Sequence, residues 1–284
     1  MARDAFSARH PGVNFLFFAL VLVMTAFWMH PVSLAISLAT GLAYCARLEG
    51  AKVWQTLRFA LPVALLAAVI NPLFNHAGAT ILWYFPSGNP LTMESILYGV
   101  AAATLLAAMI LWLRCCTLVL SSDKFLWLFG RAAPALSLLL SMTLRFVPAF
   151  RRRYRLVSQA RRKLRKNRLL RAADTLSIAV TWSLEAAIET ADSMKCRGYG
   201  LPGRTSFSIY RLETVDRVLL GFFALCGGGL IAGWIAGAFA WTWYPLAHGA
   251  VFAGFQAAFL LLCLTPVILD AWEVRQWRLS RSEI

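Results

Sequence analysis

The sequence predicts an all-α membrane protein with about six transmembrane helices and a cytoplasmic pair of crossed amphipathic helices. Hydrophobic residues make up 60% of the 284-residue chain, and the mean hydropathy is +0.64. The apolar runs are continuous, whereas the strands of a membrane barrel alternate apolar and polar residues. The net charge of +15 is concentrated between two groups of these runs. Because lipid leaves only helices or closed barrels as spanning structures, the runs predict helices.

Six apolar runs are the candidate spans. A helix needs about 20 residues to cross the hydrocarbon core, so the shorter runs must tilt or include flanking residues. The runs are Phe15–Met29, Val32–Cys45, Phe59–Ile70, Ile96–Leu113, Leu219–Phe239 and Val251–Leu269.

The distribution of basic residues predicts the orientation of the spans. Twelve Lys and Arg residues and no acidic residue lie between Arg145 and Arg171, and the positive-inside rule places this segment in the cytoplasm. Threading the chain from there puts both termini inside and leaves two outer segments, Asn71–Ser95 and Trp241–Gly249, without Lys or Arg. Turn signals around Ile81–Phe85 predict a short hairpin or lid in the first of them.

Arg114 is the exception to this threading, since it lies within the fourth span. An ionisable residue there is a functional candidate, but near the inner end it can snorkel to the headgroups, and we favour that structural role. Neither the scattered histidines nor the cysteines, which include no CxxC pair, predict a metal or catalytic cluster.

The insert from about Ser121 to Leu201 has a different pattern. Ala132–Met142 is too short to span and predicts an interfacial helix, followed by a kink at Arg145–Pro148. A basic amphipathic helix is expected over Ala149–Lys166, with Asn167 as a left-handed stop.

A second helix is predicted from an N-cap at Asp174 to Arg197. Its apolar stripe comprises Leu176, Val180, Ser183 or Leu184, Ala187, Ala191 and Met194, and small residues at Ala179, Ser183, Ala187 and Ala191 would allow close approach. Its acidic edge of Glu185, Glu189 and Asp192 is expected to pair with the basic helix. Gly198 would end this helix with a positive φ, and Tyr199 would cover Met194. The positive charge of Arg197 would interact favourably with the negative end of the helix dipole.

Two motifs go beyond this local interpretation. Leu144-Arg145-Phe146-Val147-Pro148 opens a basic helix that carries Gln159-Ala160-Arg161-Arg162, and Ala191-Asp192-Ser193-Met194-Lys195-Cys196-Arg197-Gly198-Tyr199 ends the next helix. Together they resemble the transmembrane T component of energy-coupling factor (ECF) transporters, the EcfT/CbiQ family. That family is marked by an Arg-Phe-x-Pro entry and by two Ala-Arg-Gly motifs at the ends of paired coupling helices.

The resemblance implies a non-catalytic coupling subunit of an ABC-type importer for a vitamin or a metal ion. Its partners would be two cytoplasmic ATPase subunits, which bind ATP and Mg²⁺, a membrane S component that captures the solute, and the lipid bilayer. The chain itself would bind no cofactor, metal or nucleic acid. The implied location is the cell (inner) membrane of a prokaryote.

Carried over to this sequence, Arg161 and Arg197 would dock on the ATPases. The whole docking set is Ala160, Arg161, Arg162, Cys196, Arg197, Gly198 and Tyr199, and Arg145 and Pro148 would form the hinge of the coupling helices. This chain has Arg162 where the family usually has glycine and Cys196 where it has alanine. The expected domains are 1–131 with four spans, 132–204 with the coupling helices, and 205–284 with two spans.

Two other functions remain open from the residues alone. A self-contained small-solute permease or channel would want polar groups facing one another within the spans or an inverted repeat. A membrane enzyme would need a clustered acid, base or metal set on one side of the membrane.

Overall fold

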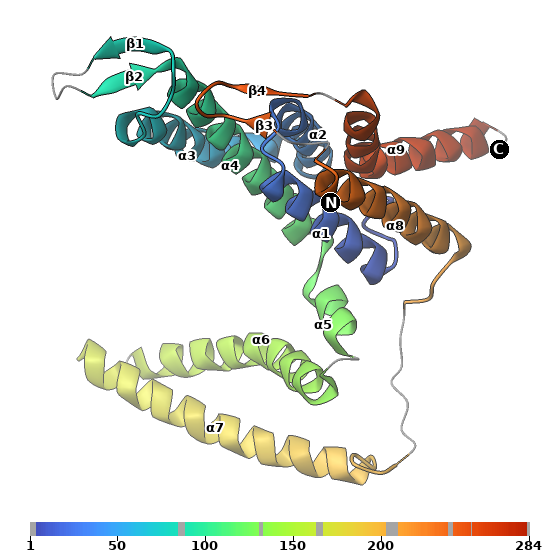
Figure 1. Cartoon of the computed structure of the whole chain (residues 1–284). Coiled ribbons are helices and arrows are strands. Elements are labelled where there is room, and N and C mark those ends of the chain that lie inside the picture. Colours follow the sequence, from blue (N-terminus) through green and yellow to red (C-terminus); the bar gives the residue numbers. More distant parts are fainter. Residues whose placement is uncertain are drawn as a thin grey trace. The chain divides into compact units, whose positions relative to one another are not determined.

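Helices form about 80% of the described residues in the computed structural model (Figure 1). The structure describes residues 4–84, 89–130, 133–162, 167–202, 210–237, 241–250 and 252–282. The chain divides into two compact units. We call Met1–Ser121 with Tyr210–Ile284 the membrane unit and Ser122–Ile209 the helical unit.

Most of the membrane unit is built from six apolar helices, which coincide largely with the six predicted runs. They are α1 (Pro11–Phe27), α2 (Pro31–Glu49), α3 (Val53–Phe74), α4 (Met93–Val119), α8 (Thr214–Ile235) and α9 (Ala253–Ser282). Helix α4 packs against α1, α2 and α3, while α9 packs against α2 and α8. Between α2 and α3 lies the short 3₁₀ helix η1 (Gly50–Lys52), where Gly50 has a φ of 58° that a residue with a side chain adopts only with strain.

Four helical stretches within the described residues are long and apolar enough to cross a membrane. These are Pro31–Phe74, which combines α2, η1 and α3, and Met93–Val119, Thr214–Ile235 and Ala253–Gln276. Helix α1 is apolar but shorter. The predicted fold class, an all-α membrane protein, is confirmed by these helices.

Aromatic rings fill the centre of the membrane unit. Phe17 of α1 contacts Trp112 of α4 and Phe223 of α8 at ring-centroid distances of 5.8 and 5.6 Å. The indole N–H of Trp112 donates to Ser37 Oγ at 3.0 Å, so burying it leaves no unsatisfied donor. A Cβ on Gly41 would meet the Trp112 ring at 3.1 Å, which explains a glycine there. The core therefore joins helices that are distant in sequence.

Two of the apolar helices each begin with a His-Pro dipeptide. His10 and His30 are the N-cap residues of α1 and α2, and each accepts a backbone N–H through Nδ1, from Gly12 and Val32 respectively. The proline that follows suits the first helical position, where no N–H bond is lost. Burial lowers the pKa of both histidines, which keeps Nδ1 unprotonated and able to accept.

Short strands join the helix ends at one edge of the membrane unit. Strand β1 (Ile81–Tyr84) pairs antiparallel with β2 (Pro90–Thr92), as the turn signals predicted, and β3 (Trp241–Thr242) pairs with β4 (His248–Gly249). The backbone N–H of Ala79 donates to the carbonyl of Pro245 at 3.0 Å, which connects the two segments. Both belong to the stretches that carry no Lys or Arg.

The helical unit consists of α5 (Ser122–Gly130), α6 (Pro134–Arg162) and α7 (Arg168–Cys196). Helix α6 is continuous where two helices were expected, since Pro148 lies inside it. A proline in a helix removes one hydrogen bond and clashes with the carbonyl four residues earlier, here Leu144, at a cost of about 3 kcal/mol. Leu144 is 42% exposed, so water can reach this turn and satisfy the carbonyl.

Helix α7 has its N-cap seven residues earlier than predicted. Its N-cap is Asn167, with φ −71° and ψ 118°, so Asn167 is extended and the predicted left-handed stop is wrong. Asp174 is not the N-cap but lies within the second turn of the helix. The sequence misled because Arg168–Ala173 carries no capping residue of its own and is as compatible with a loop as with a first helical turn.

Candidate functional site

The candidate site is the α6–α7 hairpin, and its best-defined part is the end of α7. Arg197 is the C-cap residue, and Gly198 follows with a φ of 74°, as predicted. The Gly198 N–H donates to the Lys195 carbonyl at 2.9 Å and the Tyr199 N–H donates to the Met194 carbonyl at 3.0 Å. This pair of bonds is a Schellman motif, which satisfies the last carbonyls and fixes the helix end.

Arg197 is presented at this fixed end without a carboxylate. The residue is exposed, and its guanidinium makes no ion pair within the part of the chain that the structure describes. Cys196 beside it is an exposed free thiol, and Tyr199 is 50% exposed. A rigid backbone with an unpaired guanidinium suits recognition of a carboxylate by two parallel hydrogen bonds.

Arg161, the other predicted docking residue, already has a partner. Its NH1 lies 3.2 Å from Asp174 Oδ2, with 36% and 31% of the two side chains exposed. Ala160 is exposed, and Arg162 is the last residue of α6, of whose side chain the structure gives no account. The early start of α7 places Asp174 on the second turn, where it reaches α6.

An aromatic seam joins α6 to α7. Phe146 stacks on Trp182 at 5.5 Å with an angle of 15° between the rings, and Arg153 lies 4.8 Å from the centre of the same indole. Thr175 and Ala179 of α7 are buried in this unit. The cation–π contact of Arg153 and the stacked ring thus join α6 to α7 in addition to the Arg161–Asp174 ion pair.

This seam lies on a different face of α7 from the predicted one. Leu176, Val180 and Leu184 are 55%, 45% and 62% exposed, and Ala187 and Ala191 are also exposed. Of the small residues expected at the close approach, Ala179 is buried and Ser183 is partly buried. The predicted packing stripe is therefore wrong, and the face of α7 that includes Thr175, Ala179 and Trp182 is the one that packs.

Among the described residues, the acidic edge of α7 makes no ion pair with α6. Glu185 and Glu189 are exposed and make no ion pair among the described residues, while Asp192 lies 4.0 Å from Lys195 of its own helix. Asp174, which sequence reasoning assigned to a cap, makes the cross-helix pair instead. Arg145 and Pro148, the proposed hinge, lie exposed along the unbroken α6.

Arg114 has a partner that sequence reasoning missed. Its Nε and NH2 donate to Glu49 Oε1, at 2.7 Å for Nε, and Thr56 Oγ1 donates to Glu49 Oε2 at 2.9 Å. The Glu49 side chain is 4% exposed. The available signal was that Glu49 is the sole acidic residue between Asp4 and Glu94, so it was the natural counter-charge for an arginine on the neighbouring span.

A second polar cluster ties the N-terminal segment to α2 and α9. Tyr44 donates to Asp4 Oδ2 at 2.6 Å, and Arg47 NH1 lies 3.0 Å from Asp270 Oδ2. Burial, reinforced by the nearby Asp270, raises the pKa of Asp4 to about 6. We assign this cluster a structural role, because Tyr44 and Arg47 bond to carboxylates of the same chain.

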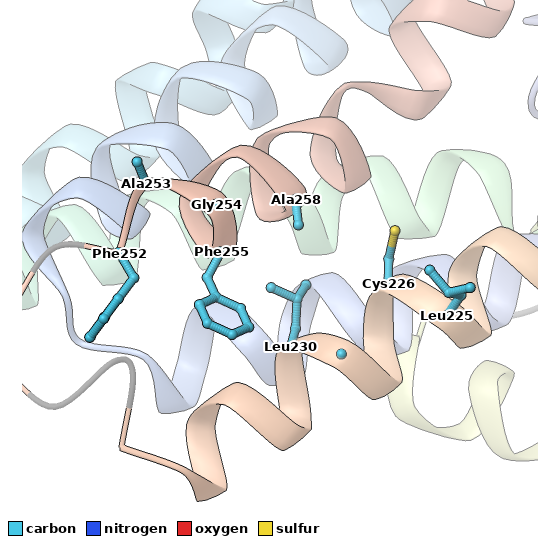
Figure 2. A pocket seen from close by; sticks show the side chains of 9 residues that line it. Leu225, Cys226, Leu230, Phe252, Ala253, Gly254, Phe255 and Ala258 are labelled. Carbon is cyan, nitrogen blue, oxygen red and sulfur yellow. The ribbon is translucent and has the colours of Figure 1, made fainter.

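An apolar pocket of about 450 Å³ lies between α8 and α9. Figure 2 shows Phe255 of α9 and Leu230 of α8 pointing toward one another across it. Cys226 is its only side chain with a heteroatom, so the pocket offers space for a hydrocarbon group but no acid, base or nucleophile suited to catalysis. No group of three His, Cys, Asp or Glu residues placed to hold a metal ion occurs among the described residues.

No protein-family model matches the chain, and no curated protein matches its sequence.

Proposed function

We propose that this chain is the membrane coupling subunit of an ECF-type importer. It would link ATP hydrolysis by two cytoplasmic ATPase subunits to reorientation of a membrane S component that carries a vitamin or a metal ion. ATP and Mg²⁺ would be bound by the ATPases, and this chain would itself catalyse nothing. It would lie in the cell (inner) membrane of a prokaryote with six spans and both termini in the cytoplasm.

The observation that carries the proposal is Arg197, an exposed arginine at the capped end of α7 that makes no ion pair with any residue the structure describes. The Gly198 and Tyr199 backbone hydrogen bonds fix the backbone at Arg197, so little backbone freedom is lost there when a partner binds the side chain. A partner groove with a carboxylate would gain a charge-assisted pair without breaking one in this chain.

Arg161 would contribute differently to docking. It is about one-third exposed while paired with Asp174, so a partner carboxylate would share or replace that pair. The exchange offsets part of the gain, because a half-solvated pair contributes about 1 kcal/mol or less. We therefore expect Arg197 to dominate the affinity and Arg161 to set the orientation of the hairpin.

The charge distribution supports the proposed topology. The edge of the membrane unit with the β1–β2 and β3–β4 strands contains no Lys or Arg, whereas Arg9, Arg47 and Arg114 all have carboxylate partners elsewhere in the unit. A cytoplasmic position for these arginines and for α6 satisfies the positive-inside rule. Helix α1 is about 26 Å long at 1.5 Å per residue, which a thinned bilayer or flanking residues would accommodate.

The test is co-purification of ATPase subunits with tagged chains in mild detergent. Arg197→Glu should reduce ATPase recovery at least tenfold, and Arg161→Glu with Arg197→Glu should abolish it. Lys195→Glu is the matched control, since Lys195 is 77% exposed on the same helix end, and it should change recovery less than twofold.

Equal loss in the Lys195 and Arg197 variants would overturn the docking assignment and leave only a general electrostatic attraction. Retained ATPase in the double variant would overturn it as well. Transport by the purified chain alone in liposomes would instead favour the self-contained permease.

A further inference from the structure

A charged pocket of about 430 Å³ lies at one end of α3 and α4 and has no role in the proposed coupling function. Its lining combines polar side chains, which include Lys52, Thr56 and Arg114, with the apolar side chains of Phe59, Ile110 and Leu113. An amphipathic pocket on helices that span a membrane is exposed to lipid headgroups and acyl chains together. The charge and the apolar surface of its lining therefore indicate which class of ligand fits the pocket.

Arg114 is positioned for a ligand by the buried carboxylate of Glu49. The guanidinium has five N–H donors, and Glu49 Oε1 accepts from Nε and NH2. Glu49 is almost fully buried, whereas 47% of the Arg114 side chain is exposed. The exposed donors that remain keep their direction, because the Glu49 contact and the Thr56 bond fix the pair.

Lys52 gives the pocket its net positive charge. Glu49 neutralises Arg114, and Lys52 is exposed and makes no ion pair within the described residues. The three charged side chains of the lining thus sum to +1. A phosphodiester with a net negative charge is matched by this lining, whereas the choline of a zwitterionic lipid would be repelled by the ammonium group.

The apolar part of the lining selects a lipid rather than a soluble phosphate. Phe59 and Leu113 are 66% and 48% exposed, and they continue the pocket along the span, where a hydrocarbon chain would lie. Basic pockets between transmembrane helices bind anionic headgroups. We propose that the Lys52–Arg114 pocket binds an anionic phospholipid, with the phosphodiester between the two cations and an acyl chain along Phe59 and Leu113.

Native mass spectrometry of the detergent-purified full chain tests the site, with dioctanoyl phosphatidylglycerol and dioctanoyl phosphatidylcholine as probes. The wild type should bind phosphatidylglycerol more tightly than phosphatidylcholine. Lys52→Gln should weaken phosphatidylglycerol binding about fivefold, which corresponds to about 1 kcal/mol for one cation near a membrane surface. Arg58→Gln is the control, because Arg58 is an exposed cation on α3 that does not line the pocket.

Two results would overturn the proposal. Equal weakening by Lys52→Gln and Arg58→Gln would show general attraction to a basic surface, and displacement of phosphatidylglycerol by inorganic phosphate at similar concentrations would show a soluble-anion site. Unchanged recovery of ATPase subunits with Lys52→Gln distinguishes this site from the α6–α7 hairpin, and each proposal can therefore fail alone.

Discussion

The two units treat their arginines in different ways. In the membrane unit, Arg9, Arg47 and Arg114 form ion pairs with Glu213, Asp270 and Glu49, which lie far away in sequence. In the helical unit, the arginines of α6 and α7 outnumber their carboxylate partners. Six of these arginines make no ion pair among the described residues. Arg171 is partly exposed, and the other five are exposed: Arg145, Arg151, Arg152, Arg155 and Arg197.

The difference separates charge that stabilises a fold from charge that is left for a partner. These three arginines of the membrane unit have carboxylate partners because an uncompensated charge near hydrocarbon costs several kcal/mol, whereas the exposed Arg58 of the same unit makes no ion pair among the described residues. Water solvates the exposed arginines of α6, so their excess is tolerated there. Removing the paired carboxylate of Glu49 should therefore cost far more stability than removing an exposed carboxylate of α7 that has no ion pair among the described residues.

The largest expected effect is that of Glu49→Ala. This change leaves Arg114 without its buried counter-charge, and loss of one partner of such a pair costs about 3 kcal/mol, less the part that water recovers at the half-exposed guanidinium. Glu185→Ala on α7 is the matched control and should change stability by less than about 0.5 kcal/mol. The melting temperatures of the two variants in detergent test this prediction. Similar melting temperatures would contradict the claim that the Glu49 ion pair stabilises the membrane unit.

Asp4→Asn should alter the pH dependence of the membrane unit. Because the pKa of Asp4 in the folded chain is about 6 rather than 3.8, the folded state holds its proton more tightly. The bound proton adds up to about 3 kcal/mol to the free energy of unfolding. This stabilisation is fully present below about pH 4 and is lost as the pH rises through about 6. Asp4→Asn should therefore raise the melting temperature at pH 7 and flatten its fall between pH 4 and 6.

The control for that prediction is Asp123→Asn, an exposed carboxylate at the start of α5. A melting curve with the same pH dependence in the wild type and in Asp4→Asn would contradict the assignment.

Trp182→Ala should loosen the α6–α7 hairpin. The variant loses the stacking on Phe146 and the contact with Arg153, which together contribute about 2 kcal/mol. Amide hydrogen exchange should speed up in α6 and α7 and stay unchanged in the membrane unit. Leu184→Ala, at a side chain 62% exposed on the same helix, should leave exchange almost unaffected, and equal acceleration would contradict the seam.

The smallest effect distinguishes two glycines. Gly198→Ala forces a side chain into the left-handed region and should destabilise the end of α7 by about 1 kcal/mol. Gly228→Ala, inside α8 with open space around the added carbon, should stabilise by up to about 1 kcal/mol through helix propensity. Opposite shifts of the melting temperature are expected, and shifts of the same sign would contradict the cap.

Local patterns predicted more of this molecule than pairings across the chain did. Apolar runs indicated the helices, and the order Arg197-Gly198 indicated the cap, because each depends on neighbouring residues. The packed face of α7 and the partner of Arg114 were predicted wrongly or missed, since each depends on a residue more than ten positions away. The start of α7 was predicted wrongly for a local reason, because Arg168–Ala173 carries no capping residue of its own. Trp182 is an example of the packed face. Its indole carries a polar N–H as well as apolar carbons, and it packs on a face of α7 that is less hydrophobic than the predicted stripe.

The distribution of thiols gives the α7 end a built-in reporter. Of the six free cysteines, Cys45, Cys115 and Cys263 are buried, Cys116 and Cys226 are partly buried, and Cys196 alone is exposed. A water-soluble maleimide dye should label Cys196 in the unaltered chain. The emission of that dye, one residue from Arg197, would then follow partner binding at this helix end in real time without any engineered substitution.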